Sequence, residues 1–200
     1  KNYNNFFFFF CILNKCLTKQ DFEKATNIGS NNVNDMPNKQ QMQFAFENKV
    51  YYNNIATSIL YLIESKTRGS LQSTSLLGMK KYSLEHMMPK KWRNNWGNLA
   101  SQKDEEERDR ILLLIGNLTI IQQRLNASIR DDSWQNKLDG KAGKNNGLRQ
   151  YAAGISITAN CLNKTVWDEN EIMARSEELF KKAIKIWAIA SDNQTTTKWG

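Results

Sequence analysis

One short segment limits the possible folds of this chain more than any other: residues 82–87 are β-prone, and Pro89 stands close behind them. A proline cannot donate to a continuing strand ladder, so we expect the strand to end at His86, the only histidine of the chain. Successive side chains of a strand point to opposite faces. The segment therefore predicts a strand end with the Glu85 carboxylate on one face and the imidazole on the other.

A second β-prone segment follows at residues 117–121. Before it, acidic residues at 104–107 precede an apolar pattern at 108–115, and Gly116 stands just past the end, which is the charge and capping order of a helix. Residues 125–134 favour a further helix. Strand, connection, strand and helix is the order of the ββα-metal arrangement.

Helical periodicity dominates most of the remaining chain. It predicts one helix over about residues 41–66 and a last helix that begins at Asp168, a suitable N-cap residue. The side chains expected to face the core from this last helix are Ile172, Leu179, Ala183, Ile186 and Trp187. We therefore expect an α+β fold, mostly helical, in which helices surround a ββα-metal core.

The charge and the cysteine content indicate the kind of partner and the redox environment that we expect for this chain. Lys and Arg outnumber Asp and Glu by 28 to 20, and the net charge of +8 favours a polyanionic partner such as nucleic acid. Three cysteines without a C-x-x-C pair indicate neither a structural zinc nor a secreted disulfide framework, so a reduced, cytoplasmic setting is expected. The apolar run at residues 6–13 is too short to span a bilayer, and we interpret it as a piece of a buried helix.

Two asparagines follow the histidine at informative distances. Asn117 lies 31 positions after His86, enough to contain the helix expected between the two strands, and Asn126 lies nine positions further on. Nine positions carry the chain along a short strand, round a turn and into a helix, which returns Asn126 to the histidine. The two asparagines stand where a single-metal nuclease would need them, so the pattern indicates phosphodiester hydrolysis.

These residues resemble the HNH branch of the His-Me finger nucleases, in which an acid-His pair with a nearby proline precedes an asparagine nine positions before a metal ligand. More narrowly, the chain resembles the C-terminal nuclease domain of GmrSD-type, modification-dependent restriction endonucleases. The motifs that carry this resemblance are Glu85-His86 with Pro89, Trp96-Gly97, Ile115-Gly116-Asn117-Leu118-Thr119, Leu125-Asn126, Lys137, and a closing set of Trp167, Ile172, Arg175, Leu179 and Trp187. Asp131 departs from the pattern, since such domains often carry an asparagine there.

The resemblance implies a role for each matching residue of the site. His86 would be the general base that takes a proton from the attacking water, and Asn117 would hold the imidazole by accepting its Nδ1 proton. Glu85 and Asn126 would present oxygens to a single Mg²⁺ or Mn²⁺ ion.

Basic residues near these motifs are candidates for binding DNA phosphates. They are Lys137, Arg124 and Arg130, although most surface lysines and arginines are only solvated charges. Arg175 is expected to be structural instead, because its planar fork can bind the carbonyls of a neighbouring loop.

The expected organisation has three parts. Residues 1–80 form a helical segment, as the tail of an upstream domain or linker region; residues 81–190 form the HNH-type nuclease domain; residues 191–200 form a flexible tail. Because the chain opens on Lys1 and an apolar stretch, we expect it to be the C-terminal part of a longer protein. The resemblance implies an N-terminal nucleotide-hydrolysing domain or subunit that directs it.

The function expected from these features is that of a metal-dependent DNA endonuclease, the cleavage module of a restriction or phage-defence protein. It would work in the cytoplasm, on DNA and without a membrane partner. Two alternatives stay open: a non-catalytic nucleic-acid-binding domain that retains the fold, and a helical interaction module in which His86 is structural.

Overall fold

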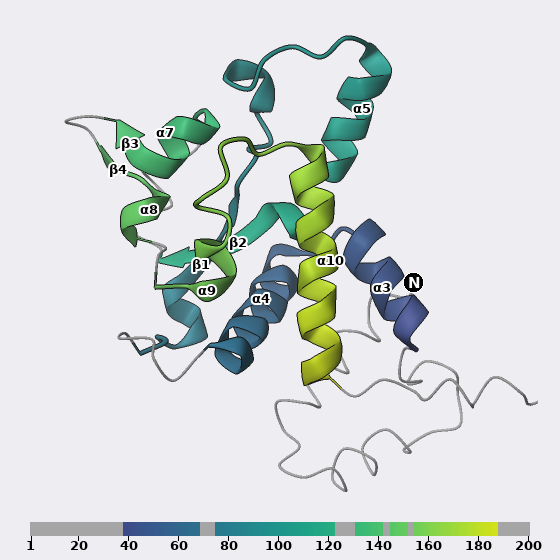
Figure 1. Ribbon diagram of the computed structural model, residues 1–200, viewed down its shortest axis with the longest axis vertical. Coiled ribbons are helices and arrows are strands. Elements are labelled where there is room, and N and C mark those ends of the chain that lie inside the picture. The colour runs from purple at the N-terminus through teal and green to yellow at the C-terminus, as the bar shows by residue number, and fades with distance from the viewer. Residues whose placement is uncertain (1–37, 69–74, 123–130, 142–144, 152–153, 188–200) are drawn as a thin grey trace, which may run out of the picture. The chain divides into compact units, whose positions relative to one another are not determined.

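The computed structural model describes residues 38–68, 75–122, 131–141, 145–151 and 154–187 of the 200-residue chain (Figure 1). The chain divides into two units, one of residues 1–42 and 187–200 and the other of residues 43–186, and each is described by itself. The second unit holds almost all of the described elements. The buried helix piece expected at residues 6–13 and the tail expected at 191–200 lie outside the described residues.

Helices make up most of the described structure. The α-helices are α3 (Lys39–Asn48), α4 (Asn53–Thr67), α5 (Gln102–Ile111), α7 (Trp134–Asp139), α8 (Leu148–Tyr151), α9 (Ser156–Ala159) and α10 (Glu169–Ile186). The strands are β1 (Tyr82–His86), β2 (Leu118–Gln122), β3 (Gly140–Lys141) and β4 (Asn145–Asn146), and the 3-10 turns are η1 (Met79–Lys81), η2 (Trp92–Asn94) and η3 (Ile115–Asn117). The expected fold class, α+β and mostly helical, is confirmed.

Strands β1 and β2 form an antiparallel pair in which His86 lies opposite Leu118 and Tyr82 opposite Gln122. Both strands pack on α4, and β2 also contacts α9 (Figure 1). Helix α10 covers η3, the turn that leads into β2. The two strands expected from the sequence are therefore confirmed to within a residue, and β1 ends at the histidine as Pro89 indicates.

The single helix expected over about residues 41–66 is wrong, because residues 49–52 separate α3 from α4. Within this break Val50 forms an isolated antiparallel bridge with Leu114, and the Tyr51 hydroxyl donates to the Ala45 carbonyl (2.8 Å). β-branched and aromatic side chains favour extended backbone. The Val-Tyr-Tyr run therefore leaves the helix to meet a partner distant in sequence, which helical periodicity does not reveal.

Helix α5 is displaced toward the N-terminus from its expected position. It begins after Ser101, whose hydroxyl accepts from the Asp104 N–H (3.2 Å), and it ends at Ile111, short of the expected end at residue 115. Ser101 is a favourable N-cap residue, and the acidic residues then lie in the first turn. Gly116 is thus not the residue that ends this helix.

Gly116 instead allows η3 to lie directly against α10. A Cβ at this position would overlap the Ile172 carbonyl oxygen and the Ser176 hydroxyl, and the Gly116 N–H already donates to that hydroxyl (3.1 Å). Arg175 Nη1 donates to the carbonyls of Gly116 and Leu118 at 2.7 Å each. The expected structural role of Arg175, binding carbonyls of a neighbouring loop, is confirmed.

The helix expected over residues 125–134 is only partly within the described structure. Residues 123–130 lie outside it, and residues 131–133 are not helical. Helix α7 begins at Trp134, after the N-cap residue Ser133, so the expected end of the earlier helix at residue 134 is wrong. The start of the last helix is confirmed, because Asp168 Oδ1 accepts from the Glu171 N–H (3.0 Å).

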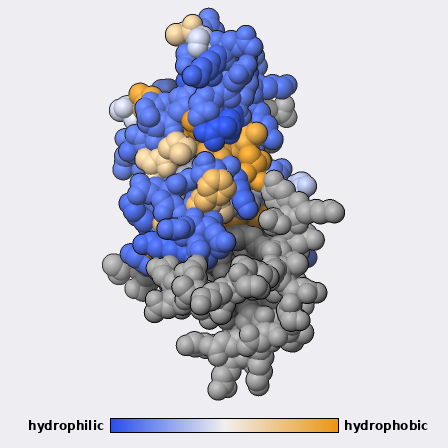
Figure 2. Space-filling model, turned by 90° about the vertical axis from the view of Figure 1, so that its right-hand side faces the viewer, coloured by the Kyte–Doolittle hydropathy of each residue, from blue (hydrophilic) through white to orange (hydrophobic). Residues whose placement is uncertain are grey.

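One face of the molecule shows how polar and apolar residues are distributed on it. On the face drawn in Figure 2, hydrophilic residues predominate and the hydrophobic ones gather in a smaller area. None of the described helices has the length and apolar character that crossing a membrane requires.

We predict that Gly116→Ala lowers the free energy of unfolding by about 1–3 kcal/mol, because the added methyl group meets backbone that cannot move aside. Gly78→Ala is the matched control, since no atom lies within 4 Å of a Cβ built there. Urea unfolding of both variants measures the difference. Equal stability of the two variants would show that η3 and α10 are not packed this closely.

Candidate active site

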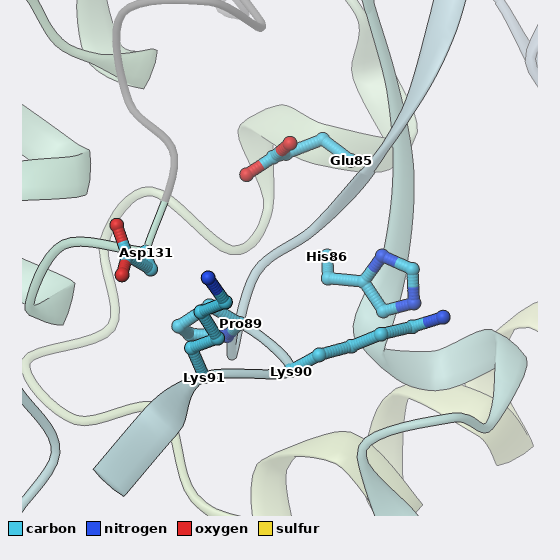
Figure 3. A pocket seen from close by; sticks show the side chains of 6 residues that line it. All are labelled: Glu85, His86, Pro89, Lys90, Lys91 and Asp131. Atoms are coloured by element: carbon cyan, nitrogen blue, oxygen red, sulfur yellow. The ribbon is translucent and has the colours of Figure 1, made fainter. Parts of the chain in front are cut away.

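Residues at the end of β1 and in the turn that follows it line a pocket of about 180 Å³. The lining residues are Glu85, His86, Pro89, Lys90, Lys91 and Asp131. Figure 3 shows Lys90 extending past the His86 ring, while Lys91 lies toward Asp131. The pocket thus brings together the acid-His pair, two lysines and a second carboxylate.

The turn after β1 is held by the fully buried side chain of Asn117. Its Oδ1 accepts from the Met88 N–H (2.7 Å) and from Trp167 Nε1 (3.0 Å), and its Nδ2 donates to the carbonyls of Met88 (2.7 Å) and Leu112 (2.8 Å). Its backbone carbonyl accepts from the Met87 N–H (2.9 Å). One amide therefore uses its full hydrogen-bonding capacity to fix the backbone just beyond the histidine.

The expected contact between Asn117 and the Nδ1 proton of His86 is not formed in the part of the chain that the structure describes. The Asn117 oxygen is already occupied by two other donors. Asn117 holds the backbone on which His86 stands instead of holding the imidazole itself. It is therefore a positioning residue in this structure.

The far side of the same turn is fixed by the buried Trp92. Its Nε1 donates to Asp109 Oδ1 (2.7 Å), and the guanidinium groups of Arg93 and Arg108 lie 4.4 and 4.7 Å from its ring centroid. The short segment from Met88 to Trp92 is therefore held at both ends, by Asn117 at Met88 and by Asp109 at Trp92.

Beneath the pocket, Glu85 forms an ion pair with a buried lysine. Glu85 is 6% exposed, and its Oε1 accepts from Lys137 Nζ (2.6 Å), which also donates to the His86 carbonyl oxygen (2.6 Å). Burial raises the pKa of Glu85 and lowers the pKa of Lys137, and in each case the partner opposes the shift. The ammonium group of Lys137 in α7 thus balances the charge of the Glu85 carboxylate in β1.

The phosphate-binding role expected of Lys137 does not fit this position. The side chain is fully buried, and its ammonium group already has two acceptors. In this structure Lys137 ties α7 to the end of β1. The exposed cations of the pocket are Lys90 and Lys91, which the sequence signals as a lysine pair directly after the strand-ending Pro89.

Burial and repulsion keep the His86 ring uncharged. Burial lowers the pKa of the imidazole to about 4, and the positive charges of Lys90 and Lys137 add to the effect. At neutral pH the ring is therefore in the form that can accept a proton.

Asp131 supplies the second carboxylate of the pocket. The Asn94 side chain donates to Asp131 Oδ2 (3.1 Å), and the Asn95 side chain donates to the Asp131 carbonyl (2.8 Å). The Asn94 hydrogen bond is the largest cause that lowers the pKa of Asp131. The position that departs from the resembled pattern is thus an ionised carboxylate that lines the same pocket as Glu85 and His86.

The two carboxylates that line this pocket are ligands of the kind that a hard divalent cation such as Mg²⁺ prefers. Within the described ranges, no group of three or more His, Cys, Asp and Glu side chains could hold a metal ion. The carboxylates of Glu85 and Asp131 line one pocket, and Mg²⁺ in proteins often has one or two carboxylate ligands and otherwise binds water and phosphate oxygens. The predicted ligand Asn126 and the predicted phosphate-binding residues Arg124 and Arg130 lie outside the described residues.

The family described as GmrSD restriction endonucleases, C-terminal domain, has a sequence model that matches residues 36–182. The match contains β1, β2 and α7, and it also includes α4, which lies before the expected domain boundary at residue 81. The search of curated proteins finds no match.

Because His86 is the only histidine, its titration can be followed directly by proton NMR of the imidazole. With a chelator present, we predict a midpoint far below the ordinary value of 6.5 and near pH 4. The unfolded chain should titrate near 6.5, so the free energy of unfolding should fall as the pH drops from 6.5 toward 4. A folded-state midpoint at the unfolded value would contradict the partly buried, lysine-flanked position of the ring.

Proposed function

Since the chain belongs to the family of GmrSD restriction endonuclease C-terminal domains, we propose that it hydrolyses phosphodiester bonds in DNA. The observation that carries the proposal is the uncharged His86 ring, which lines one pocket with two exposed lysines and the Glu85 carboxylate. An uncharged imidazole can accept a proton from water, and lysines attract the DNA backbone.

In the proposed reaction His86 removes a proton from a water molecule whose oxygen attacks the phosphorus atom. The new phosphorus–oxygen bond forms as the bond to the 3′ oxygen breaks, and the 3′ oxygen leaves as a hydroxyl after it takes up a proton from solvent water. The imidazole carries the abstracted proton until solvent removes it. Asn117 fixes the backbone after His86 and so keeps the ring in place during the reaction.

Glu85 and Asn126 are the residues that we propose to hold one Mg²⁺ or Mn²⁺ ion, with β1 and β2 as the strands of an HNH-type ββα-metal core. When bound, such an ion polarises the phosphate and stabilises charge on the leaving oxygen. Glu85 is suited to this role because it is a pocket carboxylate held in place by Lys137. Arg124 and Arg130 remain our proposed contacts to flanking phosphates.

The wider role that we propose is the cleavage module of a restriction or phage-defence protein in the cytoplasm. Nothing in the described residues resembles an element that reads base edges, and a basic surface attracts any phosphate backbone. Target selection would then belong to an N-terminal nucleotide-hydrolysing domain or subunit.

We predict that His86→Ala lowers the rate of plasmid nicking with Mg²⁺ or Mn²⁺ by about 10²–10⁴, the usual contribution of a general base. DNA binding and the unfolding curve should change little, because the ring forms no hydrogen bond with any residue that the structure describes. Lys66→Ala, an exposed substitution away from the pocket, is the control.

Activity of His86→Ala within about threefold of the unchanged chain would remove His86 from the reaction. Salt-sensitive DNA binding without any cleavage by the unchanged chain would favour the non-catalytic nucleic-acid-binding domain instead.

A further inference from the structure

The pocket has an unusual charge for a site that is to hold a divalent cation. Its lining contains two carboxylates, Glu85 and Asp131, and two ammonium groups, Lys90 and Lys91, and the buried Lys137 is paired with Glu85. With the imidazole uncharged, the formal sum is one positive charge. A proton shared between Glu85 and Lys137 leaves this sum unchanged, and a protonated His86 would only increase it.

Neighbouring charged groups do not reverse this balance, because Asp132, whose charge acts on Lys137, is itself paired with Lys141 (2.7 Å). Residues 123–130, which lie outside the described structure, contain Arg124 and Arg130 but no Asp or Glu. This segment can therefore add positive charge to its surroundings and cannot add negative charge.

The carboxylate best suited to the cation is also already occupied. Lys137 Nζ lies 2.6 Å from Glu85 Oε1, so a cation that binds Glu85 must share it with an ammonium group. Like charges at such distances repel, and the repulsion is strong where water is excluded. The free pocket is therefore a weak site for Mg²⁺ or Mn²⁺.

The same charges make the pocket a good site for an anion. Every arginine within the described ranges is engaged elsewhere: Arg68 with Glu64, Arg93 with Glu105 and Asp109, Arg108 with Glu169, Arg110 with Glu107, Arg149 with Asp139, and Arg175 with backbone carbonyls. Lys90 and Lys91, by contrast, are exposed and form no ion pair with a described residue. They stand on a turn held at both ends, by Asn117 and by Trp92.

We propose that this pocket takes up its divalent cation only together with a phosphodiester, so that DNA binds first and completes the cation site. The inference rests on the proposed function and extends it to the order of binding. One phosphodiester brings one negative charge, which cancels the excess positive charge of the pocket, and its oxygens add hard ligands to the carboxylate oxygens of Glu85. Lys90 and Lys91 are the residues that make the free pocket select the anion.

The test measures Mn²⁺ binding by the loss of the free-ion EPR signal, at fixed ionic strength. The protein is the full chain with His86→Ala, so that DNA stays uncleaved, and the titration is run with and without a short DNA duplex, with the duplex alone as the blank. We expect Mn²⁺ to bind at least about tenfold more tightly to the complex than to the free chain. By linkage, Mn²⁺ must tighten DNA binding by the same factor, which fluorescence anisotropy measures independently.

Removal of Lys90 and Lys91 tests whether their charge is the cause of the weak Mn²⁺ binding by the free chain. In the same background, Lys90→Ala with Lys91→Ala leaves the pocket one negative charge, so Mn²⁺ should bind the free variant more tightly and the gain from DNA should shrink to below about threefold. Damage to the fold would weaken Mn²⁺ binding, which is the opposite direction. The control, Lys66→Ala with Lys103→Ala, removes the same charge from two exposed positions outside the pocket and should change neither value.

Two results would overturn the proposal: Mn²⁺ affinity that is equal within about twofold with and without DNA, or free-chain affinity that does not rise when Lys90 and Lys91 are removed. Plasmid nicking by the unchanged chain separates this failure from failure of the proposed function. Nicking together with DNA-independent Mn²⁺ binding contradicts only the order of binding, whereas DNA-dependent Mn²⁺ uptake without nicking supports the order and contradicts hydrolysis.

Discussion

The buried amide of Asn117 is the interaction on which the rest of the site depends. It joins the turn after β1, the C-cap residue Leu112 at the end of α5, and the indole of Trp167, with every donor and acceptor used. A buried amide that lost one of these partners would leave a polar group unsatisfied, at a cost of about 1–3 kcal/mol. The positions of His86, Lys90 and Lys91 depend on this amide, because these residues lie on either side of the Met88 backbone that it holds.

A second constraint acts on the carboxylate. Lys137 reaches Glu85 from a helix 52 residues away in sequence and also holds the His86 carbonyl, so α7 is tied to the same strand end. A buried ion pair contributes little net stability on average, but removal of either partner leaves an uncompensated charge. The pair therefore determines where the carboxylate stands and how much negative charge the pocket can offer to a cation.

Local patterns in the sequence predicted the parts of the fold that local interactions decide. Pro89 ended β1 at the histidine, Asp168 capped the last helix, and Arg175 bound carbonyls as its planar fork allows. The misplaced elements depend on distant partners: Val50 leaves its helix for a bridge with Leu114, and Gly116 is needed for contact with α10 and not to end α5. The site shows the same division. Glu85 and His86 could be predicted because they are neighbours in the sequence, whereas the Lys137 ion pair and the presence of Asp131 in the pocket could be seen only in the folded chain.

The central claim is that the chain catalyses attack of water on a DNA phosphodiester with departure of the 3′ oxygen. End-group analysis of nicked plasmid tests it most directly, with Mg²⁺ or Mn²⁺ supplied and a chelated sample beside it. The account predicts nicks with 3′-hydroxyl and 5′-phosphate ends, formed only when the divalent ion is present. Nicks with 3′-phosphate ends, nicking that persists in the chelated sample, or no nicking under any of these conditions would contradict it.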